Sequence, residues 1–231
     1  MTSQPASSSY NRGHSPLESK RLSGKPLFPV AENPSFALSR PLWLASSSRY
    51  RRQLLERLGI PFECRSPQVE ESRRQGEAPA NLAERLALAK AKAIAADESG
   101  ALVIGSDQVC ALGDECLGKP GSAAAQVAML ARLSGQVVTF HTAVAIVGIE
   151  AGLWKQHRDE TRCVFRQLGE REILDYIARE PAHDCAGGFK SEGLGISLFE
   201  RMESVDPTAL IGLPLIWVAN TLRPFAAAST R

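Results

Sequence analysis

The sequence is poor in cysteine, and its cysteines are not arranged for disulfide, redox or metal chemistry. There are five in 231 residues, and none of them form a CxxC pair. A domain held together by disulfides needs a dense, even set of cysteines, and a structural zinc site needs closely spaced ones. We therefore expect free thiols in a reducing, cytoplasmic environment.

Long hydrophobic runs and charge of one sign are also missing. A membrane-spanning helix needs roughly 18 apolar residues, but the longest candidate, 209–219, is interrupted by Gly212 and Pro214. The N-terminus lacks the apolar core of a signal peptide. Residues 1–40 hold five Lys or Arg and two Glu, whereas the remaining residues hold 22 basic and 23 acidic side chains. This near-neutral body gives no electrostatic reason to expect a nucleic acid or a membrane as partner.

Several catalytic and nucleotide-binding motifs are absent. The sequence contains no GxxxxGK[ST] and no GxGxxG after a predicted strand, which argues against P-loop and dinucleotide-binding folds. It also lacks HExxH and GxSxG, and its four histidines show no metal-ligand spacing. Any catalytic chemistry must therefore use other side chains.

The overall composition is typical of a globular protein, and the order of the predicted elements is that of an α/β fold. Hydrophobic residues make up 44% and charged residues 23% of the chain. Residues 1–40, with nine Ser and five Pro, are expected to form a disordered extension, and residues 41–225 a single domain. Hydrophobic periodicity predicts strands at 42–45, 60–65, 102–105, 136–149 and 153–166, a hairpin at 109–117, and helices at 50–58, 79–98, 122–133, 170–179 and 213–222. This order favours a twisted mixed sheet flanked by helices.

The first candidate site is the Ser46-Ser47-Ser48 segment between a strand and a helix that begins with arginines, Arg51 among them. Helix N-termini attract anions, and cations there oppose the helix dipole. The pattern is typical of a phosphate site, but a Ser N-cap followed by a solvated basic face would have the same sequence.

A second candidate site combines two groups of carboxylates. Asp107 follows the predicted buried strand 102–105, at the position where open α/β sheets bind ligands. Glu71 belongs to an acidic pair in a polar loop, so the two groups could share one divalent cation. Alone, Asp107 would equally well cap a turn.

Three further features could contact a ligand, and the two lysines among them could contact phosphate. Lys119 precedes a proline that restricts its backbone, and Lys90 lies in the long Ala-rich helix. Residues 185–195 contain four glycines, which allow close approach to a ligand. The alternatives are an exposed turn lysine, a solvated helix face and a flexible loop.

Together, these segments resemble the Maf family of nucleoside triphosphate pyrophosphatases. The resemblance spans about 42–222 and rests on LASSSRYRRQLLERLGIPFE, VEE, RLALAKAKA, VIGSDQV, LGKP, LSGQVVTFHTAVAI, CAGGFKSEGLGI and LIGLPL. SDQV and FKSEG are the forms of the subgroup that hydrolyses 7-methyl-GTP, whereas the dTTP/UTP subgroup carries Thr after the Asp and Gln in place of the Glu. The family usually has Pro where this chain has Arg49.

The resemblance implies a Maf-like fold with the active site in a cleft, and hydrolysis between the α and β phosphates that gives a nucleoside monophosphate and pyrophosphate. It implies these roles: Asp107 as catalytic acid/base; Ser46, Arg51, Lys90 and Lys119 at phosphate-binding positions; Glu71 and Asp107 at the metal site; and Tyr50, Gln108 and Glu192 as determinants of the base. Mg²⁺ or Mn²⁺ is the expected cofactor, since oxygen ligands suit hard cations.

Two alternatives to this function stay open: a pyrophosphatase for dTTP, UTP or another non-canonical nucleotide, and a nucleotide-binding regulator of cell division. The expected partner is a small-molecule nucleotide, without nucleic acid or membrane, and a homodimer is allowed.

Overall fold

A computed structural model describes residues 37–227 of the chain. Of the expected disordered extension, residues 1–36 lie outside the described part. Residues 37–40 belong to the folded body: Leu38 forms a bridge with Ala226, and the backbone N–H of Ser39 donates to the carbonyl oxygen of Phe225 at 2.8 Å. The described fold therefore begins before the expected boundary at residue 41.

The fold is α/β, as predicted, and is built on one mixed sheet. Its strands are β1 (Leu42–Ala45), β2 (Glu63–Cys64), β3 (Leu102–Leu112), β4 (Glu115–Leu117), β5 (Val137–Gly148), β6 (Leu153–Phe165) and β7 (Phe199–Glu203). They follow the order β2-β1-β3-β5-β6-β7, and β4 pairs with β3. β1 is parallel to β2 and to β3, whereas the other pairs are antiparallel.

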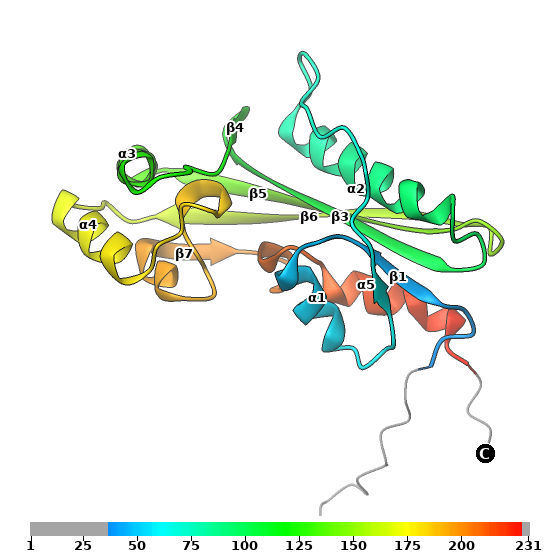
Figure 1. Cartoon of the computed structure of the whole chain (residues 1–231). Coiled ribbons are helices and arrows are strands. Elements are labelled where there is room, and N and C mark those ends of the chain that lie inside the picture. The colour runs from blue at the N-terminus through cyan, green and yellow to red at the C-terminus, as the bar shows by residue number, and fades with distance from the viewer. Residues whose placement is uncertain (1–36, 228–231) are drawn as a thin grey trace, which may run out of the picture. The chain divides into compact units, whose positions relative to one another are not determined.

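Five α-helices accompany the sheet within residues 37–227: α1 (Arg49–Glu56), α2 (Pro79–Ala95), α3 (Ala123–Leu133), α4 (Glu170–Arg179) and α5 (Leu215–Leu222). Figure 1 shows α2 on one face of the sheet and α1 and α5 on the other. None of these helices combines the length and the apolar character that crossing a bilayer requires.

Alternating side chains of β3 point to opposite faces of the sheet. Leu102 and Ile104 join the core formed with α1 and α5, whereas Val103 packs against α2. Gly105 also faces α2, and a Cβ placed there would lie 2.3 Å from the carbonyl oxygen of Ala87. Glycine therefore lets α2 lie directly against the strand, just before the polar residues of β3.

Strand β3 is longer than the sequence predicted, so the predicted position of Asp107 beyond a strand end is wrong. Asp107 lies within an 11-residue strand, because β5 pairs with β3 continuously from Val103 to Ala111. The predicted strand at 60–65 is confined to β2, and β7 was not predicted.

Candidate active site

A cleft of about 610 Å³ opens along β3 where β1 ends. The last residue of β1, Ala45, pairs with Gly105, and β4 first contacts the same edge at Cys110. Within residues 37–227 no strand pairs with that edge between these points. The cleft is lined by all nine residues that the sequence singled out: Ser46, Tyr50, Arg51, Glu71, Lys90, Asp107, Gln108, Lys119 and Glu192.

The segment from β1 to α1 directs hydrogen-bonding groups into this cleft. Ser48 is the N-cap of α1, and its hydroxyl accepts from the backbone N–H of Arg51 at 3.4 Å. The buried Ser46 hydroxyl accepts from the backbone N–H of Ser48 at 3.1 Å and from Nη1 of Arg51 at 3.4 Å. The first turn of α1 contains no acidic residue. This arrangement keeps the positive end of the helix available to an anion.

Arg51 is half-buried and held in place by a backbone carbonyl from a distant part of the chain. Its Nε donates to the carbonyl oxygen of Gly212 at 2.9 Å. Burial lowers the pKa of Arg51, and the negative charges of Asp107 and Glu71 oppose this change. An arginine remains charged under all ordinary conditions, so the guanidinium presents a fixed cation to the cleft.

A buried lysine joins the two acidic groups. The Nζ atom of Lys90 lies 2.6 Å from Oδ1 of Asp107 and 2.8 Å from Oε1 of Glu71. Lys90 and Asp107 are 7% and 8% exposed, whereas Glu71 reaches in from an exposed loop. Burial raises the pKa of Asp107, and the charge and hydrogen bond of Lys90 oppose the rise. Lys90, predicted as a phosphate-binding residue, is thus also the cation that compensates these carboxylates.

Both carboxylates retain an oxygen for a further ligand. Lys90 contacts only Oδ1 of Asp107 and Oε1 of Glu71, and the second oxygens have no hydrogen bond within residues 37–227. No group of three or more His, Cys, Asp or Glu in that part of the chain could hold a metal ion by itself. Two carboxylates fit Mg²⁺ in the mode where substrate phosphates and water complete the coordination.

The other predicted side chains line the rim of the cleft. Lys119 follows β4, is exposed and forms no ion pair within the described residues. The exposed Glu192 accepts from the Ser191 hydroxyl at 3.3 Å. The guanidinium of Arg49 lies over the ring of Tyr50, 4.8 Å from its centroid, and donates to its hydroxyl at 2.8 Å.

Sequence reasoning missed several groups that take part in the cleft. Phe140 and Asp184 line it, and the carbonyl oxygen of Gly212 holds both Arg51 Nε and the hydroxyl of Ser106, each at 2.9 Å. A backbone carbonyl leaves no signal in residue type, although Gly212 lies in the LIGLPL segment, which carries part of the family resemblance.

Comparisons with known proteins identify the family. A protein of Albidiferax ferrireducens named 7-methyl-GTP pyrophosphatase is 48% identical over 194 residues, which are 84% of this chain and 96% of the relative. Proteins of the same name from Polaromonas sp. and Xanthomonas oryzae pv. oryzae are 52% identical over 178 residues and 53% identical over 182 residues, covering 77% and 79% of this chain and 81% and 95% of the relatives. The family model described as Maf-like protein matches residues 41–225. The chain therefore belongs to the Maf family.

Proposed function

We propose that this chain hydrolyses 7-methyl-GTP to the nucleoside monophosphate and pyrophosphate. The relatives compared above are named 7-methyl-GTP pyrophosphatase, and they are about half identical to this chain over most of their length. The observation that carries the proposal is the charge distribution in the cleft: the cations Arg51 and Lys119 can contact phosphates, and Asp107 lines the same cleft, paired with Lys90. A triphosphate needs compensation of its negative charge and one aligned water molecule, and this site has groups for both.

The proposed steps use the chain's own groups. Arg51, Ser46 and the first turn of α1 bind phosphate oxygens, and Lys119, which lines the same cleft, contacts them as well. The free oxygen of Asp107 accepts the proton of the attacking water, and Lys90 keeps that carboxylate in position. Alternatively, the free oxygen of Asp107 would join that of Glu71 in holding Mg²⁺ or Mn²⁺, which when bound supplies charge stabilisation to the phosphates; the oxygen serves one of these two roles, not both.

The base lies, in this proposal, near Tyr50, Gln108 and Glu192. Methylation at N7 leaves a delocalised positive charge on guanine, and an aromatic face such as that of Tyr50 attracts a cation by roughly 0.5–2 kcal/mol. The carboxylate of Glu192 can accept hydrogen bonds from the donors of the guanine edge. An uncharged pyrimidine lacks the positive charge, which favours 7-methyl-GTP over dTTP and UTP.

The reaction is tested by hydrolysis in ¹⁸O-labelled water with Mg²⁺. Attack at the α phosphorus places the label in the nucleoside monophosphate and releases unlabelled pyrophosphate. Label in pyrophosphate, or release of inorganic phosphate alone, would contradict the proposed reaction. Binding without turnover would favour the regulatory alternative.

A further inference from the structure

Three acceptors surround the nitrogen end of the Gln108 side-chain amide and share its two hydrogens. Nε2 lies 2.9 Å from the hydroxyl of Thr142, 2.9 Å from the carbonyl oxygen of Leu210 and 3.1 Å from that of Ala209. The two carbonyls can only accept hydrogen bonds, so the nitrogen and not the oxygen must occupy this end of the amide. The amide oxygen, which has no hydrogen bond within residues 37–227, is the end that a bound base can reach.

The hydroxyl of Thr142 is the side-chain contact that holds the amide in this orientation. Thr142 is fully buried in β5, directly opposite Gln108 in the strand register. Its single hydroxyl hydrogen is donated to the carbonyl oxygen of Ala209 at 3.0 Å. Having donated there, the hydroxyl can only accept from Gln108. Reversing the amide would place its oxygen against two carbonyl oxygens, and the Thr142 hydroxyl could donate to that oxygen only by giving up its hydrogen bond to Ala209.

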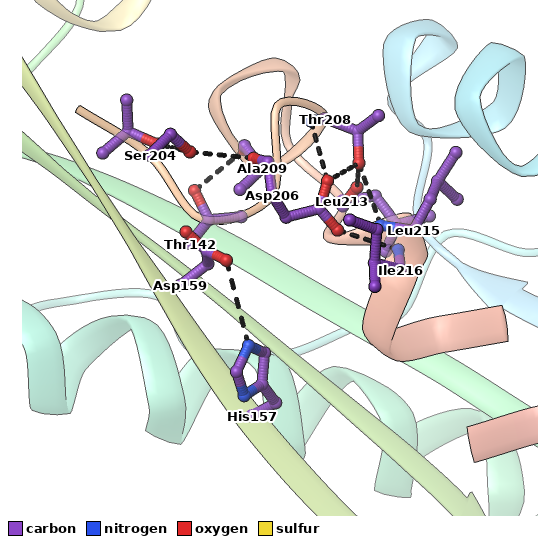
Figure 2. Close-up of polar contacts among 11 residues, drawn as sticks. Thr142, His157, Asp159, Ser204, Asp206, Thr208, Ala209, Leu213, Leu215 and Ile216 are labelled. Carbon is purple, nitrogen blue, oxygen red and sulfur yellow. Dashed lines mark hydrogen bonds and ion pairs between the residues drawn. The ribbon is translucent and has the colours of Figure 1, made fainter. Parts of the chain in front are cut away.

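The segment that carries the Ala209 carbonyl is held by the buried carboxylate of Asp206 (Figure 2). Asp206, 3% exposed, accepts at Oδ1 from the backbone N–H and the hydroxyl of Thr208, at 2.8 and 2.6 Å. Its Oδ2 accepts from the backbone N–H of Ile216 in the first turn of α5, at 2.8 Å. The segment 206–212 is thus fastened to α5 at one end and to the cleft at the other.

We infer that Thr142 is a positioning residue, which together with the segment anchored by Asp206 directs the acceptor oxygen of Gln108 toward the base. The site would then read a base edge that presents an N–H donor, as the guanine edge does, and would disfavour an edge with a carbonyl at that point. Only the identity of the base rests on the proposed function. The orientation of the amide rests on the contacts of Gln108 alone.

The kinetic test compares Thr142→Val, which keeps the shape and removes the hydroxyl, with Thr142→Ser, which keeps the hydroxyl. In Thr142→Val we expect KM for 7-methyl-GTP to rise at least about tenfold with kcat within about twofold, the pattern of lost uniform binding. The preference of Thr142→Val for 7-methyl-GTP over dTTP should be smaller than that of the wild type. Thr142→Ser should restore both values. An unchanged KM and preference in Thr142→Val, or equal loss in Thr142→Ser, would overturn the inference.

A second readout needs no nucleotide. The side-chain amide protons of Gln108, followed by NMR in the full chain, should exchange with solvent at least about tenfold faster in Thr142→Val than in the wild type. Thr139→Val, on the same strand and without a hydrogen bond of its hydroxyl in the described residues, is the matched control and should leave this rate unchanged. Unchanged exchange in Thr142→Val would contradict the positioning role of Thr142. If the wild type fails to hydrolyse 7-methyl-GTP but the exchange rates behave as expected, only the proposed function fails.

Discussion

The buried carboxylate of Asp159 should lower the stability of the wild type at neutral pH, and Asp159→Asn should remove that cost. Asp159 is 4% exposed, and its Oδ1 has no hydrogen bond in the described part of the chain. Burial and the charge of Asp206 raise the pKa of Asp159, whereas His157, whose Nε2 lies 3.9 Å from Oδ2, and the backbone N–H groups of Asp206 and Glu160 oppose the rise. Figure 2 shows His157 and Asp159 below the segment that carries Asp206.

The direction in which stability changes with pH follows from the linkage between proton binding and folding. A carboxyl whose pKa is raised by folding stabilises the folded state while it is protonated, and that stability is lost as the pH rises from the ordinary value of about 3.9 through the raised folded pKa. An ionised, unsatisfied buried group costs about 1–3 kcal/mol, and we take about 1–2 kcal/mol because His157 offsets part of it.

Urea denaturation at pH 4 and pH 8 measures this effect. Asp159→Asn should be more stable than the wild type by about 1–2 kcal/mol at pH 8 and nearly equal to it at pH 4. Asp114→Asn, at an exposed turn position, is the control and should show no such difference. A destabilised Asp159→Asn at pH 8 would refute the reasoning and show that the ionised carboxylate is needed.

Three further predictions concern the cleft. Lys90→Met removes the cation between two carboxylates and should lower the free energy of unfolding, measured in urea, by about 3–5 kcal/mol. The control Lys92→Met, at an exposed position of the same helix, should have little effect. Equal effects of the two substitutions would contradict the buried ion pair. Glu192→Gln should lower kcat/KM for 7-methyl-GTP at least about tenfold, or about 1.4 kcal/mol, with a smaller loss for UTP; equal losses would assign Glu192 to catalysis. Arg51→Ala and Lys119→Ala should weaken all triphosphates to a similar extent in steady-state assays, and a changed ranking of bases would place either residue in the base site.

Local sequence patterns predicted most helices and strands because their signals are short-range. α4 has the predicted bounds, since its apolar residues Ile173 and Tyr176 share one face and Pro181 follows its end. The long strands β5 and β6 were also predicted within one residue at each end. The same patterns ended β3 too early, because Asp107 and Gln108 are polar residues in a strand whose pairing with β5 sustains it.

The residues of the cleft could be listed from the sequence, but not their contacts. The bond from Arg51 to the carbonyl of Gly212 joins positions 161 residues apart, and that from Gln108 to Leu210 joins positions 102 residues apart. Such backbone contacts depend on the folded path of segment 206–212 and not on its residue types. The salt bridge of Lys90 with Asp107 and Glu71 became evident only from the structure, because it depends on how α2, β3 and the loop before α2 pack together.

The most direct test of this account is pyrophosphate release from 7-methyl-GTP, with Mg²⁺, by the wild type and by Asp107→Asn. The wild type should release pyrophosphate with a higher kcat/KM for 7-methyl-GTP than for dTTP or UTP. Asp107→Asn should keep its fold by circular dichroism and lose at least about a hundredfold in kcat, the scale of one general-base contribution. Turnover of Asp107→Asn at the wild-type rate, or no pyrophosphate from 7-methyl-GTP in the wild type, would contradict the account.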